Sequence, residues 1–308
     1  MTDRGTLALT GATGFVGAHL LEAALAQGWQ VRALARRPQR ERAGVTWVEG
    51  DLAGRDALAR LSEGANALIH VAGAINAPDR AGFERANVEG TAAMLEAARS
   101  GGAGRFVQVS SLAAREPDLS DYGWSKAQAD ALVAGSGLDW TIIRPPAVYG
   151  PGDRETLQLF RAVKGGVVPV VGEGRFSIIH VHDLAQALLA AATAPELRGA
   201  THEVCDSTPG GFDQPGFARA IGKAMGVSPH ILRLPTGLLR PAAALAEGWA
   251  GLTGGRARLS RDRARYFAHP DWVASRAPLA ETGLWRPSIP AGEGLRATAD
   301  WYRRAGWL

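Results

Sequence analysis

The glycine-rich segment TGATGFVG, at residues 10–17, constrains the fold of this chain most. It follows a short apolar run at residues 7–9 and precedes a helical pattern at residues 16–27. A turn of this kind brings free backbone N–H groups and the positive end of a helix dipole to one place. The segment therefore predicts a dinucleotide phosphate site. A glycine-rich turn without a ligand is the alternative.

The glycines of this segment have separate tasks. Gly11 permits the tight turn, Gly14 lets a pyrophosphate approach the backbone, and Gly17 lets the helix pack closely on the strand. The cofactor-binding residues predicted here are Gly11, Thr13, Gly14, Phe15, Val16 and Gly17.

Short β-type runs alternate with helical runs through the first half of the chain. The predicted strands are residues 7–9, 31–35, 45–48, 67–71, 106–109 and 140–143, and the predicted helices are 16–27, 83–99 and 122–134. Short apolar strands separated by helices are typical of a buried parallel sheet. The predicted fold class is α/β, with a Rossmann-type doubly wound parallel sheet in residues 1–150.

The alternation is less regular after residue 150. Residues 151–308 are predicted to form mostly a smaller, mainly helical C-terminal substrate lobe, with a return to the sheet around residues 178–204. Helices are expected at residues 183–192, 256–265 and 295–304. Residues 236–252 are interpreted as a packed or amphipathic helix, with a role at a membrane surface as the lesser alternative.

Composition limits the partners and the compartment. The net charge of +4 among 308 residues is small and scattered, so no nucleic acid partner is expected. The single cysteine, Cys205, excludes an internal disulfide and fits a reducing compartment, so a cytoplasmic location is predicted. We expect no signal peptide and no integral membrane segment, because no apolar run is long enough. The sequence leaves open whether the chain forms a homodimer.

The end of the second predicted strand bears on the choice of cofactor. An acidic residue there would accept hydrogen bonds from the ribose of NAD. This chain instead has Arg36 and Arg37, whose guanidinium groups suit a 2′-phosphate. NADP(H) is therefore predicted as the preferred cofactor, with NAD(H) left open and two solvated surface arginines as the alternative. After the third strand come Asp51 and Leu52; the Asp51 carboxylate could meet the adenine amino group or cap a helix.

The segment YGWSK carries the predicted chemistry. Tyr122 and Lys126 lie four residues apart at the start of a predicted helix, and therefore on one face of it. A nearby ammonium is expected to lower the pKa of the phenol, which can then exchange a proton with a substrate oxygen. Ser111 ends the fifth strand at the ligand-binding edge of the sheet, where its hydroxyl could hold that oxygen.

Together these motifs resemble the extended branch of the short-chain dehydrogenase/reductase family, which is epimerase/dehydratase-like. The similar segments are TGATGFVG (10–17), GDL (50–52), HVAG (70–73), NVEGT (87–91), VSS (109–111), YGWSK (122–126), RPPAVYGPGD (144–153) and HVHDLA (180–185). The resemblance implies a Rossmann-type cofactor domain and a C-terminal substrate domain.

The resemblance also implies residue roles. Ser111, Tyr122 and Lys126 would be catalytic, and Tyr122 and Lys126 would also contact the cofactor. Asn87 would support the active site from its helix, with a cap at a helix start as the alternative. The further residues implied beside the cofactor are Ala72 and Gly73, and, next to the nicotinamide carboxamide, Pro145 and Val148.

Two features bear on the substrate. Relatives that act on nucleotide sugars usually carry an arginine shortly before the HVHDLA segment, but Phe176 stands in that place here, with Arg175 adjacent. The C-terminal half is rich in tryptophan and is similar to hydroxysteroid dehydrogenase and dihydroflavonol reductase-like relatives. A small apolar or aromatic substrate is therefore predicted. The alternative is that the tryptophans, Trp249, Trp272, Trp285, Trp301 and Trp307, only pack the lobe.

His180 and His182 alternate as they would on one face of a strand, but no third ligand is evident nearby, so no metal site is predicted. Asp183 is interpreted as the N-cap of the following helix.

The leading hypothesis is an NADP(H)-dependent oxidoreductase that interconverts an alcohol and a carbonyl, with Tyr122 as the acid/base. A nucleotide-sugar epimerase or dehydratase with the same catalytic residues is the second hypothesis. The third is a non-catalytic dinucleotide-binding subunit, like the family members that resemble accessory subunits of complex I. Such members often lose the tyrosine or the lysine, whereas this chain keeps both.

Overall fold

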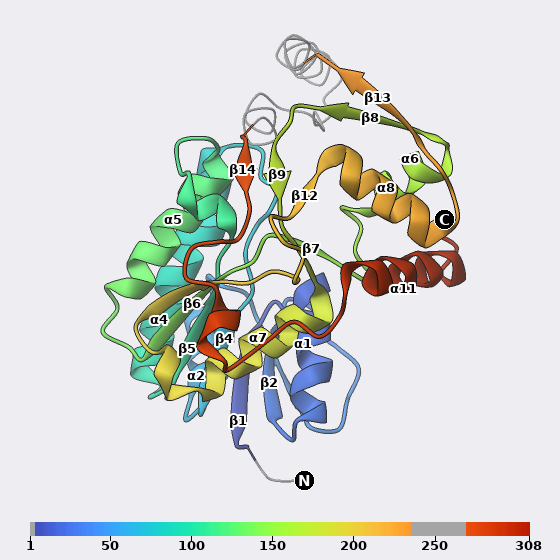
Figure 1. The fold of residues 1–308 in the computed structure, drawn as a ribbon. Coiled ribbons are helices and arrows are strands. Elements are labelled where there is room, and N and C mark those ends of the chain that lie inside the picture. Colours follow the sequence, from blue (N-terminus) through green and yellow to red (C-terminus); the bar gives the residue numbers. More distant parts are fainter. Residues whose placement is uncertain (1–3, 236–268) are drawn as a thin grey trace.

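The computed structural model describes residues 4–235 and 269–308 (Figure 1). A seven-stranded parallel sheet forms its centre, in the order β11-β6-β5-β4-β1-β2-β3. Its strands are β1 (Thr6–Thr10), β2 (Gln30–Ala35), β3 (Val45–Glu49), β4 (Ala67–His70), β5 (Phe106–Val109), β6 (Trp140–Arg144) and β11 (Ala200–Glu203). The predicted doubly wound parallel sheet is confirmed.

Helices cover both faces of this sheet (Figure 1). On one face, α1 (Phe15–Ala26) and α7 (Val181–Thr193) pack against each other and bury an apolar layer with the strands. The other face is covered by α2 (Arg55–Ser62), α4 (Gly90–Ser100) and α5 (Asp121–Ala134). Helix α2 has no counterpart among the predicted elements, because only two of its eight residues, Leu58 and Leu61, are large and apolar.

The direction in which the strands are added reverses between β1 and β4. β2 and β3 extend the sheet on one side of β1, and the remaining strands extend it on the other. The loops that leave β1 and β4 therefore diverge, and a crevice forms at the carboxyl ends of these strands, where open α/β sheets bind ligands. The glycine segment leaves β1 at this crevice.

A second, smaller core lies beyond the carboxyl edge of the sheet, in the upper part of Figure 1. Side chains such as Phe160, Phe217 and Tyr302 fill it. Its elements and the short segments around it are β7 (Ala147–Tyr149), α6 (Leu157–Lys164), β8 (Val167–Val171), β9 (Arg175–Phe176), β10 (Ile178–His180), β12 (Phe212–Asp213), α8 (Gln214–Met225), β13 (His230–Leu234), β14 (Asp271–Trp272) and α11 (Ala291–Arg304). The division of the chain at residue 150 stays a prediction.

The helix predicted at residues 83–99 is divided into three parts. Helix α3 (Arg80–Phe83) leads into a π-helical turn (Glu84–Glu89), which then continues as α4. The prediction of one continuous helix is therefore wrong at its first turns. π-helical turns are frequent at functional sites, and this one contains Asn87.

The interpretation of Asp183 as an N-cap is wrong. His180 occupies the N-cap of α7, and its ring nitrogen accepts a hydrogen bond from the backbone N–H of His182. Asp183 is buried in the first turn, where its carboxylate accepts hydrogen bonds from the backbone N–H groups of Ser288 and Ile289 and from the Ser288 hydroxyl, at 2.7–3.1 Å. It ties the segment before α11 to the main sheet.

Two predictions in the C-terminal half cannot be compared with the fold. The helix predicted at 256–265 and the amphipathic segment 236–252 lie outside the described residues. None of the helices in residues 4–235 and 269–308 has the length and apolar character needed to cross a bilayer.

We predict that Asp183→Ala lowers the free energy of unfolding by at least about 1.5–3 kcal/mol, the value of one hydrogen bond to a charged group. Three donors on the segment before α11 lose their acceptor in this variant. Asp300→Ala is the control, because its exposed pair with Arg303 should be worth roughly 0–1 kcal/mol. Urea denaturation measures both; similar small effects would show that Asp183 does not tie this segment down.

Candidate active site

The turn after β1 has one backbone conformation and one close approach that favour glycine. Gly11 has a φ of +74°, which side-chain-bearing residues rarely adopt. A Cβ at Gly17 would lie 2.0 Å from the Gly11 carbonyl oxygen. The first turn of α1 therefore packs directly on the loop.

The N-terminus of α1 is suited to an anion. Its N-cap, Gly14, makes no side-chain cap hydrogen bond, and its first turn contains no acidic residue. Thr13 and Gly14 are exposed, and Phe15 and Val16 continue the turn half-buried. Free N–H groups at a helix N-terminus favour a phosphate, so these residues fit the pyrophosphate of a dinucleotide.

Thr10 connects the two strands at the crevice. Its hydroxyl oxygen accepts hydrogen bonds from the backbone N–H groups of Val71 and Ala72, each at 3.1 Å, and lies 2.8 Å from Nδ1 of buried His70. Burial and the charge of Lys126 lower the pKa of His70 to about 3, so this ring is neutral. Neither Thr10 nor His70 is among the site residues predicted from the sequence, although the HVAG segment contains the histidine.

Asn87 lies inside the π-helical turn, so it caps no helix, and its side chain contacts the loop after β4. Its side-chain amide donates to the Ala74 carbonyl at 3.0 Å and to the Ser125 hydroxyl at 2.9 Å, and its oxygen accepts from the Ala74 N–H at 2.7 Å. A Cβ at Gly73 would lie 2.7 Å from the same oxygen. Asn87 therefore fixes the loop after β4 relative to the helix that carries Tyr122 and Lys126.

Arg36 and Arg37 follow the last residue of β2 and are both exposed. Among the described residues, neither guanidinium group has a hydrogen-bond or ion-pair partner, so both are free to meet an anion.

Asp51 is also exposed and caps no helix, because Gly54 is the N-cap of α2; its carboxylate accepts from the Ala53 N–H at 2.9 Å. Leu52 contacts the start of α4 at Gly90.

Ser111 and Tyr122 meet at the carboxyl end of β5. Ser111 begins the short 3₁₀-helix η2 (Leu112–Arg115), and its hydroxyl accepts from the Ala113 N–H at 3.2 Å. A side-chain hydrogen bond joins Ser111 to Tyr122, which is in the first turn of α5. The Tyr122 ring also packs against Phe83, with 6.0 Å between ring centroids.

The pKa of Tyr122 is raised from its usual value, which is opposite to the expected direction. Removal of water from around the phenol is the main cause, and the hydrogen bond from Ser111 opposes it only in part. The structure therefore favours the neutral phenol, the form that can donate a proton.

Lys126 is buried next to the same edge. Its ammonium donates to the Val109 carbonyl at 2.7 Å, which leaves further N–H donors of the group for other partners. Burial lowers its pKa to about 8, against a smaller opposite effect of Asp130. Asp130 lies one helical turn further on and is held by Arg144 at 2.9 Å and by the Ser110 hydroxyl at 2.8 Å.

The buried group of Ser110, Asp130 and Arg144 is not among the site residues predicted from the sequence. The i, i+4 spacing of Lys126 and Asp130 was the signal that could have revealed it. Pro145 and Val148 follow Arg144 at the same edge. The Pro145 carbonyl accepts from the Leu112 N–H at 3.0 Å, and Val148 pairs with Ile179 of β10.

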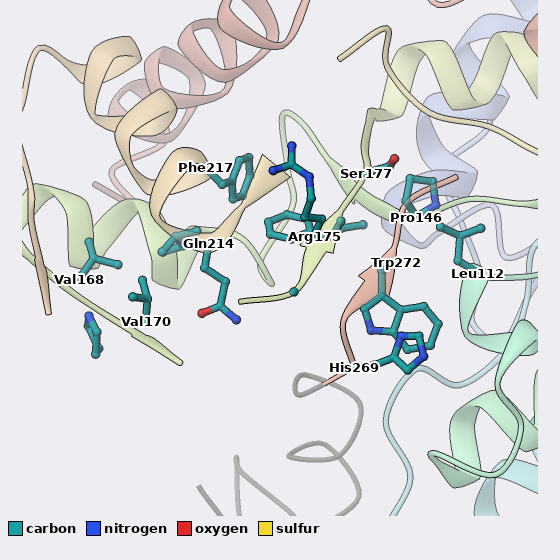
Figure 2. A pocket seen from close by; sticks show the side chains of 15 residues that line it. Leu112, Pro146, Val168, Val170, Arg175, Ser177, Gln214, Phe217, His269 and Trp272 are labelled. Atoms are coloured by element: carbon teal, nitrogen blue, oxygen red, sulfur yellow. The ribbon is translucent and has the colours of Figure 1, made fainter. Parts of the chain in front are cut away.

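A cavity of about 380 Å³ adjoins these residues on the side of the smaller core (Figure 2). It begins at Leu112 and Pro146, the residues next to Ser111 and Pro145, and extends to Val168 and Val170 of β8. The remaining lining residues are Ala147, Leu159, Pro169, Gly174, Arg175, Phe176, Ser177, Gln214, Phe217, His269 and Trp272. Most of this lining is apolar, as in pockets that take apolar ligands.

Among the described residues, Arg175 carries the one guanidinium group in the lining, and this group is already hydrogen-bonded. Arg175 donates to the carbonyls of Gly210 and Gly211, each at 2.7 Å. Phe176 packs edge-to-face on Phe217, with 5.3 Å between ring centroids. Arg175 is thus used to fix a neighbouring loop.

The tryptophans divide between packing and lining. Trp285 is buried in the core of the main sheet, and Trp301 and Trp307 pack around the core of the smaller lobe. Only Trp272, among those in the described residues, lines the cavity. Trp249 lies outside the described residues. Trp285, Trp301 and Trp307 therefore pack the two cores, and a substrate contact stays a prediction for Trp272.

The two histidines do not share a strand, because β10 ends at His180 and His182 belongs to α7. Burial lowers the pKa of His180 to about 4. Within residues 4–235 and 269–308, no three histidine, cysteine or acidic side chains are grouped so that they could hold a metal ion.

The comparisons with known proteins agree with this architecture. The profile of the NAD dependent epimerase/dehydratase family matches residues 7–204. The chain belongs to this family. The resemblance to extended short-chain dehydrogenases/reductases is thereby confirmed, and the chain is an NAD(P)-dependent oxidoreductase. The alternative of a non-catalytic subunit is set aside.

Individual relatives match most or nearly all of the chain. A ceramide reductase of Caulobacter vibrioides (strain NA1000 / CB15N) is 42% identical over 315 residues, which cover 99% of this chain and 96% of that protein. A 4-hydroxy-2-methyl-3-oxo-4-farnesyl-3,4-dihydroquinoline-1-oxide ketoreductase of Stigmatella aurantiaca is 32% identical over 273 residues, covering 79% of this chain and 80% of the relative. The crystal structure of gox2253 has a TM-score of 0.80 and 26% identity, covering 99% of this chain and 100% of that one.

The pKa of Lys126 gives a pH prediction. Below about 8 the ammonium is charged, and above it the charge near Tyr122 is lost. We predict that kcat/KM for carbonyl reduction falls as the pH rises through this value, since this parameter reports groups of the free enzyme. Asp130→Asn removes a charge that raises the pKa of Lys126, so the fall should move to lower pH. If the pH profile of kcat/KM for Asp130→Asn coincides with that of the wild type, Lys126 is not the group that causes the fall.

Proposed function

We propose that this protein is an NADP(H)-dependent reductase of a ketone on a long-chain lipid of the ceramide class, with Tyr122 as the acid/base. The observation that carries the proposal is the apolar cavity of about 380 Å³ that begins at Leu112 and Pro146, directly beside Ser111. Its lining is mainly aliphatic and aromatic, and Leu112 joins it to Ser111, the residue that precedes Leu112 in the chain. A substrate with one polar reacting group and an apolar chain fits this arrangement.

Ser111, Tyr122 and Lys126 have separate roles in the proposed reaction. The Ser111 hydroxyl holds the substrate carbonyl oxygen, and the Tyr122 phenol donates its proton to that oxygen as the carbonyl carbon is reduced. The raised pKa of Tyr122 keeps the phenol protonated for this step. Lys126 stabilises the phenolate that remains, and its free donors suit the cofactor ribose. NADPH supplies the hydride when bound.

The cofactor site fits a dinucleotide with a 2′-phosphate. The glycine turn leaves no room for a Cβ at Gly17, and the N-terminus of α1 offers N–H groups to the pyrophosphate. Arg36 and Arg37 are exposed and unpaired among the described residues at the end of β2, where the adenine ribose lies in this fold class. These groups support NADP(H) over NAD(H).

The relatives support a lipid substrate. One of them is named a ceramide reductase and another a ketoreductase of a farnesylated quinoline, and both names join a carbonyl or alcohol to a long apolar chain. A nucleotide sugar is disfavoured, because Arg175 already donates to Gly210 and Gly211 and Phe176 faces the cavity. We therefore propose a lipid with an apolar chain in place of the small apolar or aromatic substrate that the sequence predicts.

We predict that the protein oxidises NADPH in the presence of a long-chain N-acyl amino ketone, the ketone form of a ceramide, and not with UDP-glucose. Absorbance of NADPH and mass spectrometry of the alcohol measure the reaction. Calorimetric titration of the NADPH-loaded protein with UDP is the matched test of the alternative. Micromolar binding of UDP that disappears in Arg175→Ala would overturn the proposed substrate class.

Tyr122→Phe should slow the chemical step by roughly a hundredfold or more, the usual scale for a general acid. The ring remains, so packing on Phe83 and affinity for NADPH should change little. Single-turnover hydride transfer measures the step, and fluorescence of bound NADPH measures affinity. A variant that keeps the wild-type rate would show that another group transfers the proton.

The Arg36→Ala/Arg37→Ala double variant should lose about tenfold to a hundredfold in NADPH affinity, the value of a charge-assisted contact of roughly 1.5–3 kcal/mol. NADH affinity should change little, because NADH lacks the 2′-phosphate. Arg40→Ala is the matched control on the same exposed loop. Equal losses for both cofactors would contradict a role in NADP preference.

A further inference from the structure

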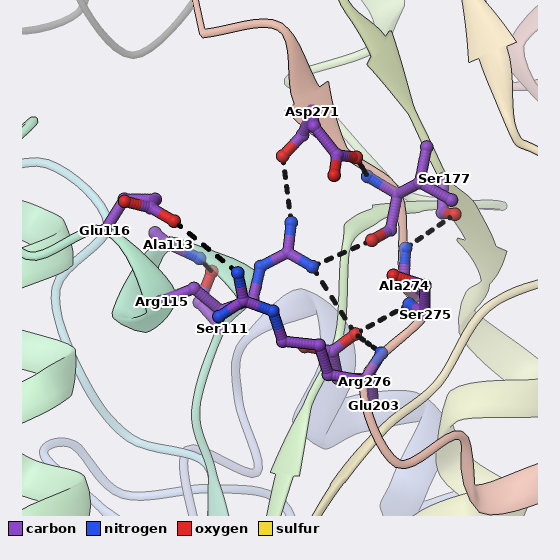
Figure 3. A network of polar contacts seen from close by, with 11 residues as sticks. Ser111, Ala113, Arg115, Glu116, Ser177, Glu203, Asp271, Ala274, Ser275 and Arg276 are labelled. Carbon is purple, nitrogen blue, oxygen red and sulfur yellow. Dashed lines mark hydrogen bonds and ion pairs between the residues drawn. The ribbon is translucent and has the colours of Figure 1, made fainter.

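A buried ion pair joins the catalytic edge to the wall of the cavity (Figure 3). Arg115 ends η2, four residues after Ser111, and Glu203 ends the edge strand β11 of the main sheet. Their charged atoms are 3.5 Å apart, and their side chains are only 2% and 3% exposed. Long charged side chains are rarely buried to this extent unless they are paired.

Both members of the pair also bind one segment of the smaller lobe. The Arg115 guanidinium donates to the carbonyls of Val273, at 2.8 Å, and Asp271, at 2.9 Å. The Glu203 carboxylate accepts from the backbone N–H groups of Ser275, at 2.8 Å, and Arg276, at 2.9 Å. Four main-chain groups within residues 271–276 are therefore held by one ion pair, as Figure 3 shows.

This segment forms a wall of the cavity. It contains Trp272, which lines the cavity and pairs through β14 with Phe176 of β9. The Arg115 guanidinium also lies over the Trp272 ring, 5.9 Å from its centroid. A third anchor is the Ser177 hydroxyl, which accepts from the Ala274 N–H at 3.0 Å. The position of Trp272 relative to Ser111 thus depends on Arg115.

Stability alone gives little reason for this arrangement. Removal of two charges from water costs free energy that their attraction often fails to recover, and apolar side chains of similar size are frequently as stable. The guanidinium has a geometric advantage instead, because its planar fork reaches two carbonyls and a carboxylate at once. The Arg115 guanidinium therefore fixes the distance between Ser111 and the segment that contains Trp272.

We propose that Arg115, paired with Glu203, is a positioning residue that sets the specificity of the pocket for long apolar chains. It fixes the Trp272 wall relative to Ser111, so that the chain of a substrate lies against the wall while its carbonyl meets Tyr122. This inference rests on the proposed function for its substrate class. Its direct consequence, a wall whose affinity for apolar chains depends on Arg115, can be measured without turnover.

The principal variant is Arg115→Lys. It keeps a positive charge opposite Glu203, but a compact ammonium cannot reproduce the planar fork. The control is Arg276→Gln on the same segment. The Arg276 side chain is exposed, and its ion pair with Glu116 is long, at 4.0 Å, so its loss should have little effect. Thermal unfolding is measured first, to show that each variant folds. NADPH affinity should stay within about twofold of the wild type for both variants, since the altered groups lie outside the predicted cofactor residues.

With the long-chain keto amide, Arg115→Lys should raise KM by about tenfold, the effect of one lost hydrogen bond to a charged group, while kcat stays within a few-fold. With a short-chain ketone of the same head group, KM should equal that of the wild type. Arg276→Gln should match the wild type with both substrates. Equal changes for the short and long substrates would overturn the assignment of chain specificity.

The measurement without turnover uses a fluorescent long-chain fatty amide as the probe. Arg115→Lys should bind it about tenfold more weakly than the wild type and Arg276→Gln do. If the wild type binds the probe but reduces no ketone, and Arg115→Lys weakens the probe, the proposed function fails and the positioning role stands. If the wild type does not bind the probe, or Arg115→Lys binds it as tightly, the positioning role is wrong.

A second variant covers the case in which Arg115→Lys does not fold. Ser177→Ala removes a single neutral anchor of the same segment and leaves the ion pair intact. Its probe affinity should fall by a few-fold, in line with a neutral hydrogen bond of about 1 kcal/mol. An unchanged affinity in Ser177→Ala would then overturn the proposal.

Discussion

The packing of α1 directly on the turn after β1 is the constraint on which the rest of the site depends. A Cβ at Gly17 would lie 2.0 Å from the Gly11 carbonyl, so the helix can only reach this position with glycine there. The helix N-terminus then points into the crevice between β1 and β4, where the order of the strands reverses. The Thr10 hydroxyl fixes the other side of the same crevice by binding the Val71 and Ala72 N–H groups.

Removal of water from this edge shifts the pKa values of the proposed catalytic groups. Burial raises the pKa of Tyr122 and lowers the pKa of Lys126 to about 8, so both shifts favour the uncharged forms. Asp130 offsets part of the shift in Lys126, and Arg144 in turn holds Asp130. The proposed proton transfer to a carbonyl needs a phenol that still carries its proton, and the same burial that opposes the phenolate provides this.

The fold was predictable from the sequence because glycine spacing and apolar strand runs depend on local geometry. The sheet then forms from these local elements. The strands of the first half and the edge at which Ser111, Tyr122 and Lys126 gather follow from these patterns. Tertiary contacts decided the rest: Asp183 binds residues 288 and 289 instead of capping its helix. The pKa of Tyr122 also depended on burial, which the i, i+4 spacing of two residues does not report.

The cavity wall illustrates why a substrate site is harder to predict than a cofactor site. The phosphate turn lies within one βα unit, whereas the wall combines η2, β9, β11 and β14, which are far apart along the chain. No local pattern distinguishes Arg115 from a surface arginine, and only folding brings it to Glu203 and to residues 271–276. These contacts cross between the sheet and the smaller lobe and do not involve the glycine turn, so the proposed substrate wall and the cofactor turn are separate parts of the structure. The separation lets one cofactor scaffold serve many substrates.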